Sequence, residues 1–422
     1  MTDPQAVQSD SAPAPAVDVL AGLRSPEVIR TRCRQILAAV SAGDSAHFVF
    51  NPSQLTVAAD QVAAVTRRRY PDLNVPYHSR WRHFEAGGID RHSPLRRKLL
   101  EESGGDQAAV ARALVDLAVV SVLLDAGAGA RWTYREADSG VELGRSEGLA
   151  LASLAGFRAG AFSSSPRQPL RVDAAALQRL SEEDLACIFQ VSGVNPLVGL
   201  AGRTRLMNAL GTALAADPVR FGELGRPGGL IDSVDSSKDT VAAPDILAAI
   251  LMGLSSIWPS AQTIAGISVG DCWRHRLATP PEYDGVDAGW VPFHKLSQWL
   301  TYSLLEPFGW AGFNVTELDE LTGLPEYRNG GLLIDSGVLV LKDPAAMLAP
   351  HSVGSELVVE WRALTVALLD VVADLVRSRL QAPDLPLAAV LEGGTWATGR
   401  ELAFAHRGGE PPLAIISDGT VF

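Results

Sequence analysis

Three short segments in the last third of the chain place charged side chains beside apolar and aromatic ones. They are Val291–Leu305, Leu321–Asp335 and Gly354–Ala363. A charge next to apolar rings is costly unless it is paired or takes part in binding or catalysis. We therefore predict that the segments meet at one buried site for a small polar molecule, where chemistry takes place. The charged residues expected around the ligand are Lys295, Glu326, Arg328, Glu356 and Arg362.

Lys295 lies in a segment with helical spacing. On the expected helix, Lys295, Trp299 and Tyr302 are spaced by four and three residues and share one face. We predict that Lys295 is a catalytic residue and that His294 beside it binds the substrate. The alternative is a structural lysine, whose stem lies along the aromatic rings while its ammonium reaches water.

Glu326 lies just before Asn329-Gly330-Gly331, which is typical of a turn that lets a ligand approach the backbone closely. A carboxylate beside a ligand can stabilise developing positive charge or orient an attacking water. Glu326 is therefore a candidate catalytic residue. The neighbouring candidates for substrate binding are Tyr327, Arg328 and Asn329.

Glu392 is a second candidate for a catalytic carboxylate. It precedes Gly393 and Gly394, and two glycines are typical of a helix end, so Glu392 could be only a cap residue. The other interpretation, which rests on a family resemblance given below, makes Glu392 a catalytic residue and places Trp396 in the substrate pocket. The sequence favours neither.

Arginines alternate with aromatic residues between Tyr77 and Phe84. A guanidinium presents a rigid fork of donors that suits a phosphate or a planar carbonyl group. The candidate binding residues in this run are His78, Arg80 and Arg82. The alternative is a solvated helix face with Trp81 and Phe84 packed inward.

The last long helix is expected to begin at Ser355 and Glu356. Free backbone N–H groups at a helix start can bind an anion, although a serine cap with an acidic first turn is the commoner arrangement. Trp361 and Arg362 on the same helix complete the set of candidate binding residues.

Metal and cofactor motifs are weak in this sequence. Cys272 and His275 have the spacing of half a zinc site, but no second pair stands at ligand spacing. Neither a phosphate-binding loop with its lysine-serine pair nor a nucleophile elbow is present. We predict that no metal and no cofactor is used.

Helical periodicity dominates the rest of the chain, so we predict a mainly α protein with a few short strands. Strand-like runs do not alternate with helices as in βαβ units. A helix start is expected at Ser25-Pro26. The other expected helices are 55–68, 106–126, 149–160, 174–180, 181–191, 202–215, 244–256, 293–305 and 355–380. In the last of them, positions 361, 364, 368, 371 and 375 form an apolar seam expected to face the core. The expected strands are 47–50, 331–334, 338–341 and 413–416.

Composition sets the protein class. The chain has 422 residues, 47% of them hydrophobic, and a net charge of −12. This charge argues against a nucleic-acid partner and against an anionic membrane surface. Three scattered cysteines imply no disulfide framework, and no signal peptide or membrane span is evident, so a cytoplasmic protein is expected. Residues 1–18 are predicted to be a disordered tail, and residues 19–422 one large helical catalytic domain or two packed lobes. No feature predicts an oligomeric state.

Several motifs resemble known families. The chain from about Ser25 to Phe422 resembles the "uracil catabolism protein four" family. The motifs that carry this resemblance are VPYHSRWRHFEAGGIDR, VGLAGR, VPFHKLSQWLTYSLLEP, GLPEYRNGGLLID and the C-terminal SDGTVF. A remoter resemblance links Phe293–Gln298, Leu324–Arg328 and Gly354–Glu356 to the queuosine-salvage nucleotide glycosylases, in which an aspartate replaces Glu326 and an Asp shortly before a Trp corresponds to Glu392.

These resemblances imply a helical fold like that of DNA glycosylases and an N-ribosyl hydrolase. The substrate implied is a small ribosylated intermediate of pyrimidine breakdown, such as ribosylurea or its 5′-phosphate. Glu326 would lie near the anomeric carbon and Glu392 near the ribose hydroxyls. An amidohydrolase acting on a ureido bond and a non-catalytic partner of a pathway enzyme are the alternatives. A DNA glycosylase is disfavoured by the acidic charge.

Overall fold

The computed structural model describes residues 14–129, 131–234, 239–258 and 262–416. It confirms a mainly α protein with a few short strands. The predicted tail lies mostly outside the described residues, but its last five residues belong to a helix that begins at Ala14. The C-terminal SDGTVF motif also lies outside them.

The chain order of the elements is as follows. The α-helices are α1 (Ala14–Leu23), α2 (Pro26–Ala42), α3 (Leu55–Arg69), α4 (Arg80–Phe84), α5 (His92–Glu102), α6 (Gln107–Leu123), α7 (Arg145–Arg158), α8 (Ala174–Arg179), α9 (Glu182–Ile188), α10 (Leu200–Ala216), α11 (Pro218–Phe221), α12 (Ala243–Leu254), α13 (Lys295–Trp310), α14 (Tyr327–Asp335), α15 (Glu356–Leu380), α16 (Leu387–Val390) and α17 (Trp396–Arg407). The strands are β1 (Phe48–Phe50), β2 (Thr133–Arg135), β3 (Glu142–Gly144), β4 (Thr240–Ala242), β5 (Thr263–Ile264), β6 (Ile267–Ser268), β7 (Cys272–Arg274), β8 (Trp290–Pro292), β9 (Asn314–Thr316), β10 (Leu339–Leu341), β11 (Pro350–Ser352) and β12 (Ala414–Ile416).

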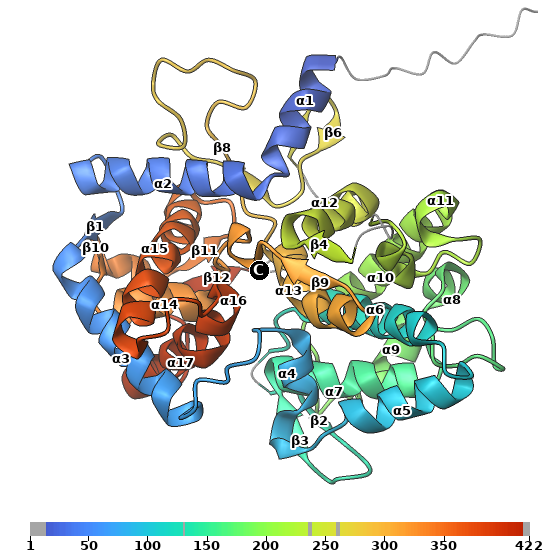
Figure 1. Ribbon diagram of the computed structural model, residues 1–422. Coiled ribbons are helices and arrows are strands. Elements are labelled where there is room, and N and C mark those ends of the chain that lie inside the picture. The colour runs from blue at the N-terminus through green and yellow to red at the C-terminus, as the bar shows by residue number, and fades with distance from the viewer. Residues whose placement is uncertain (1–13, 130, 235–238, 259–261, 417–422) are drawn as a thin grey trace, which may run out of the picture.

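The helices gather in two groups with α13 between them (Figure 1). One group joins the early helix α3 to the late helices α14, α15, α16 and α17, and the other contains α4 to α12. Helix α13 packs on α6 and α12 and is buried along almost its whole length. Helix α6 is buried on every side from Ala113 to Leu123, as expected of a helix in the interior of a large domain.

The strands connect distant parts of the chain in two-stranded pairs. Strand β1 pairs antiparallel with β10, placing Phe48 opposite Leu341. Two of the pairs are parallel, β4 with β9 and β11 with β12, and the latter places Pro350 opposite Ala414. The other antiparallel pairs are β2–β3, β5–β6 and β7–β8. All sheets in the described part of the chain have two strands.

The predicted turn at Asn329-Gly330-Gly331 and the predicted strand 331–334 are wrong, because these residues form helix α14. The glycines serve close helix packing. A Cβ atom on Gly330 would lie 2.7 Å from the Trp361 indole on α15, and one on Gly399 of α17 would lie 2.1 Å from the carbonyl oxygen of Arg328. Helix α14 can therefore approach both neighbours only where a side chain is missing.

No helix ends after Glu392, so the cap interpretation, one of the two that the sequence left open, does not apply. Residues Leu391–Thr395 form a π-helical turn that continues directly into α17. Here again the glycines permit contact, since a Cβ atom on Gly394 would lie 2.4 Å from the side chain of Val62 on α3. A π-helical turn widens the helix and often marks a functional site.

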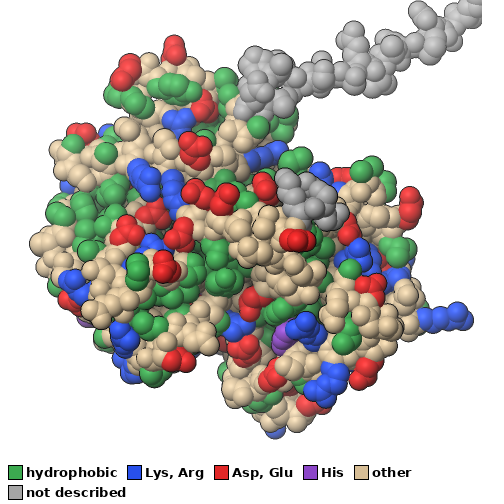
Figure 2. All heavy atoms as spheres, viewed as in Figure 1, with side chains coloured by type: hydrophobic (Ala, Val, Ile, Leu, Met, Phe, Trp, Pro, Cys, Tyr) green, Lys and Arg blue, Asp and Glu red, His purple; other side chains and the backbone are tan. Residues whose placement is uncertain are grey.

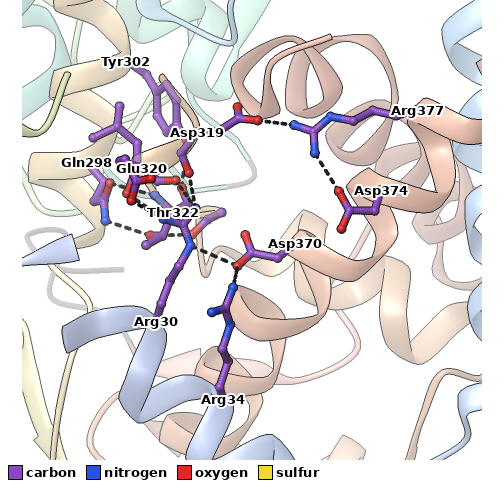
Figure 3. A network of polar contacts seen from close by, with 12 residues as sticks. Arg30, Arg34, Gln298, Tyr302, Asp319, Glu320, Thr322, Asp370, Asp374 and Arg377 are labelled. Atoms are coloured by element: carbon purple, nitrogen blue, oxygen red, sulfur yellow. Dashed lines mark hydrogen bonds and ion pairs between the residues drawn. The ribbon is translucent and has the colours of Figure 1, made fainter. Parts of the chain in front are cut away.

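A polar network holds the segment that leads into α14 (Figure 3). The guanidinium of Arg30 on α2 donates hydrogen bonds to three carbonyl oxygens, those of Asp319, Glu320 and Leu321, at 2.6–2.7 Å, and to the Asp370 carboxylate at 3.0 Å. On the other side, the Gln298 amide and the Tyr302 hydroxyl of α13 donate to Thr322 at 2.7 and 2.9 Å. The segment is thus fixed from two helices at once.

Replacing Arg30 by Ala should lower the free energy of unfolding by about 3 kcal/mol, because three carbonyls and a carboxylate lose a charged donor in a half-buried place. Arg34 provides a matched control. It binds the same carboxylate at 3.1 Å, but 62% of its side chain is exposed, against 12% for Arg30. Arg34→Ala should cost less than about 0.5 kcal/mol. The free energy of unfolding is measured by urea denaturation. Equal decreases for the two variants would show that the ion pair with Asp370, and not the three carbonyl bonds, stabilises the fold.

Candidate active site

A cavity of about 440 Å³ lies where the two groups of helices meet. Its walls come from α4 and the segment before it, from α13, the start of α14 and α17, and from the segment after α17. The loop 125–129 and the helix start at 145–146 complete the lining. On the face shown in Figure 2, acidic and basic side chains are interspersed and the surface indents between the helix groups at its lower edge. The cavity combines charged groups with aromatic rings, a lining suited to a small polar molecule.

Lys295 and Trp299 line this cavity from one face of α13. Burial lowers the pKa of the Lys295 ammonium, and the positive charge of Arg362 lowers it further, while Glu326 and Asp271 oppose the shift. A lysine with a lowered pKa gives up its proton more readily than an exposed one. Tyr302, on the same predicted face, lies deeper and donates its hydroxyl to the Thr322 carbonyl.

An ion pair fixes the start of α13 beneath Lys295. The Arg362 guanidinium donates to both carboxylate oxygens of Asp271 at 2.8 and 2.7 Å and lies 4.1 Å from the centre of the Phe293 ring. Asp271 also accepts a hydrogen bond from the backbone N–H of Lys295 at 3.0 Å. Burial raises the pKa of Asp271, but Arg362 and these hydrogen bonds outweigh it and bring the pKa to about 2. Arg362 therefore supports the site without lining it.

Glu326 immediately precedes helix α14 and lines the cavity. Its two carboxylate oxygens accept the backbone N–H groups of Arg328 at 2.8 Å and Asn329 at 2.7 Å, so it is the N-cap of the helix. Burial raises its pKa, against the lowering effect of these N–H groups and of Lys295. The carboxylate is thus held in one orientation, and each oxygen keeps a further lone pair for a ligand.

Glu392 does not line the cavity but binds a residue that does. Its carboxylate accepts a hydrogen bond from His78 Nδ1 at 2.8 Å and from the Arg69 guanidinium at 2.9 Å. Burial raises the pKa of Glu392, but the hydrogen bonds and charges of His78 and Arg69 lower it by more. The pKa therefore lies below its ordinary value. This pairing fixes the His78 ring with Nδ1 toward the carboxylate, and the ring lies on the cavity wall.

His83 stands beside His78 and is held by an arginine. Arg80 donates to His83 Nδ1 at 3.1 Å and, from the same guanidinium, to Asp125 at 2.8 Å and to the Ser121 hydroxyl at 2.7 Å. Burial and the positive charge of Arg80 lower the pKa of His83 to about 4. His83 and Asp125 both line the cavity, whereas Arg80 lies fully buried behind them.

Comparison with known proteins identifies the family. Residues 22–422 match the model of a family described as "Protein of unknown function (DUF1688)". The chain belongs to this family. Among curated proteins, "Protein urg3" of Schizosaccharomyces pombe is 38% identical over 96% of this chain and 100% of its own length. "Uracil catabolism protein 4" of Lachancea kluyveri is 37% identical over 94% of this chain and 98% of its own length.

Five of the predicted site residues line the cavity of this DUF1688 chain. They are His78, Lys295, Glu326, Tyr327 and Trp396. Three more predicted residues, Arg80, Arg362 and Glu392, do not line the cavity but support residues that do. Arg80 binds His83 and Glu392 binds His78. Arg362 binds Asp271, which accepts the backbone N–H of Lys295. The segment around Glu326 is further held by Asn329, whose amide binds the Leu324 carbonyl and accepts from the Thr395 hydroxyl.

The other predicted residues do not line the cavity, although the carbonyl that Arg328 binds belongs to Gly409, which does. Arg328 donates to the Gly409 carbonyl and Trp361 to the Gly330 carbonyl. Arg82 pairs with Glu306, and His294 contacts the Leu23 carbonyl. Ser355 binds the Ser352 carbonyl, and Glu356 pairs with Arg276 at 3.3 Å. The structure therefore does not bring Glu356, Arg328 and Arg362 around one ligand with Lys295.

Metal and membrane features can be stated for the described ranges. Cys272 lies against His294 at 3.7 Å, and His275 binds the buried Glu360 carboxylate at 3.1 Å, so the two residues of the zinc-like spacing have separate partners. Among the described residues, no group of three or more His, Cys, Asp and Glu side chains is placed to hold a metal ion. Within the same ranges, no helix has the length and apolar character needed to cross a membrane.

Sequence reasoning missed several residues of the cavity wall. His83, Asp125, Arg145 and Glu410 come from four separate segments of this DUF1688 chain. Only His83 had a usable signal, since it follows Arg80 by three positions on a helix, a spacing that places two side chains on one face. The others reach the cavity through packing between distant elements, which no local pattern reports.

Proposed function

We propose that this chain is a metal-independent N-ribosyl hydrolase of uracil breakdown. Its substrate would be a small ribosylated intermediate such as ribosylurea or its 5′-phosphate. The observation that carries the proposal is the placement of Glu326 and Lys295, a fixed carboxylate and a lysine of lowered pKa, on the wall of one cavity that also holds Trp299 and Trp396. The name of one relative, "Uracil catabolism protein 4", supports a role in uracil breakdown.

In this mechanism Glu326 acts on the sugar. Cleavage of an N-glycosidic bond passes through an oxocarbenium-like state, and a preorganised carboxylate stabilises its positive charge or orients the attacking water. The N–H groups of Arg328 and Asn329 hold Glu326 in place before the substrate arrives. Lys295 would donate a proton or a hydrogen bond to the departing nitrogen group, for which its lowered pKa is favourable.

Glu392 acts through His78 in this proposal and does not touch the ribose. One observation also favours a second function. A histidine oriented by a carboxylate is a common general base for activating water, so the His78–Glu392 pair suits an amidohydrolase that cleaves a ureido bond.

The test is to incubate the pure protein with uracil-derived nucleosides, nucleotides and ureides and to measure the products. Release of a reducing sugar from one of them is the expected result. Release of ammonia without sugar would replace the proposal by the amidohydrolase, and binding without turnover of any compound would indicate a non-catalytic partner protein.

Replacing Glu392 by Gln should lower kcat/KM about tenfold. The amide oxygen can still accept from His78 Nδ1, but the negative charge that orients the ring is lost, which is worth about 1.4 kcal/mol in a charged hydrogen bond. Glu306→Gln is the matched control, because Glu306 is also a buried carboxylate, bound by Arg82 and Ser79 outside the cavity. Equal kcat/KM values for the two variants would remove His78 and Glu392 from the mechanism.

A further inference from the structure

Four aromatic rings form one wall of the cavity. They are His78, His83, Trp299 and Trp396, and all four line it. The His78 ring centre lies 4.7 Å from that of Trp299 and 6.1 Å from that of Trp396. The corresponding distances for His83 are 5.7 and 6.5 Å. The two imidazoles therefore lie against the same pair of indoles, on the lining of the same cavity.

The partners of the imidazoles fix which nitrogen carries a proton. A guanidinium has no acceptor, so the Arg80 bond makes His83 Nδ1 an acceptor and leaves the proton of the neutral ring on Nε2. A carboxylate accepts, so the Glu392 bond places a proton on His78 Nδ1, and in this tautomer Nε2 carries a lone pair. One ring thus has a donor at Nε2 and the other an acceptor, and both rings line the cavity.

We propose that this four-ring wall is the subsite for the leaving group, and that it selects a planar, neutral group carrying an N–H next to a C=O. His83 donates to the carbonyl oxygen, His78 accepts the N–H, and the indoles stack on the plane. Amides, ureides and cyclic imides have this pattern. The inference rests on the proposed function, which places the sugar at Glu326 and so directs the leaving group to the rings.

The placement of two charged residues agrees with this division. Lys295 and Glu326 line the cavity from the first turn of α13 and from the start of α14, where they act on the part of the ligand that develops charge. Lys295 precedes Trp299 by one helical turn. The N-glycosidic bond between sugar and leaving group therefore lies over a single turn of α13 in this proposal. The polar ring nitrogens discriminate the leaving group, because an unmatched donor or acceptor there costs the ligand a hydrogen bond.

The test compares the binding of two ligands to three proteins and does not depend on turnover. The ligands are uracil, which has both N–H and C=O groups, and 1,3-dimethyluracil, which has only C=O groups. The proteins are the wild type, His78→Phe and His83→Phe, which keep an aromatic ring and lose the nitrogens. Dissociation constants come from ligand-observed NMR at millimolar concentrations, with circular dichroism to confirm the fold.

His78→Phe should weaken uracil about three- to tenfold, the range of one neutral hydrogen bond, and leave 1,3-dimethyluracil unchanged. His83→Phe should weaken both ligands by one common factor in that range. Absence of uracil binding to the wild type, or equal effects of His78→Phe on the two ligands, would overturn the subsite. This outcome is separate from that of the proposed function. A protein that releases no sugar can still show the expected changes in dissociation constant, and an enzyme that releases sugar can lack them.

Discussion

Replacing Glu326 by Gln should lower kcat by about two to four orders of magnitude while substrate binding is nearly kept. The positive charge of an oxocarbenium-like state is absent from the ground state, so a carboxylate directed at it acts mainly on kcat. The amide keeps the shape and can still accept one of the two N–H groups that Glu326 caps. Steady-state kinetics on the substrate found in the release assay provide the measurement.

The loss of the helix cap must be separated from the loss of the charge. Asp106→Asn serves as the control, because Asp106 also accepts two backbone N–H groups at a helix start, those of Ala108 and Ala109, and lies outside the cavity. It should retain the wild-type kcat. Glu326→Asp keeps the charge but withdraws it by about one bond length, roughly 1.5 Å, so its kcat should lie between those of wild type and Gln. A folded Glu326→Gln variant with the wild-type rate would make Glu326 a helix cap alone.

Lys295→Met should reduce kcat about a hundredfold or more, the lower end of the range for one acid–base group. Methionine keeps most of the apolar stem against Trp299 and removes only the charged end. Lys98→Met is the control, since Lys98 is exposed and pairs only loosely with Glu102, at 3.8 Å. Wild-type kinetics in Lys295→Met would mean that the ammonium has no part in the reaction, and a changed melting temperature with normal kcat would assign it to stability.

The helices were predictable because their apolar spacing reflects burial directly. The start of α2 is an example, with Ser25 accepting the N–H of Val28 and Pro26 at the first position, as predicted. In α15 the predicted seam holds at Leu364 and Leu368, but Val371 is exposed and Val372 is buried in its place. A strict alternation of three and four drifts relative to 3.6 residues per turn, so a long seam moves around the helix.

The composition of the candidate site was only partly predictable. Glu356 and Arg362 are six residues apart on α15, which places their side chains about 120° apart around the helix axis, so both cannot face one ligand. Glycine patterns misled for a related reason. Gly330 looks like a turn residue in sequence, but its missing side chain accommodates Trp361, which is thirty-one positions away and invisible to any local pattern.

One of the two helix groups combines helices from both ends of the chain, and this has a consequence for the rate of folding. Helix α3 packs on α15, β1 pairs with β10, and Arg30 binds Asp370, which is 340 residues further on. Contacts that close such long loops form late and slow the folding of a large domain. During refolding from urea, helical circular dichroism should therefore return well before ligand binding, because the cavity wall exists only after residues from both ends have met. Delayed recovery of binding would then report assembly of the last contacts and not formation of the helices.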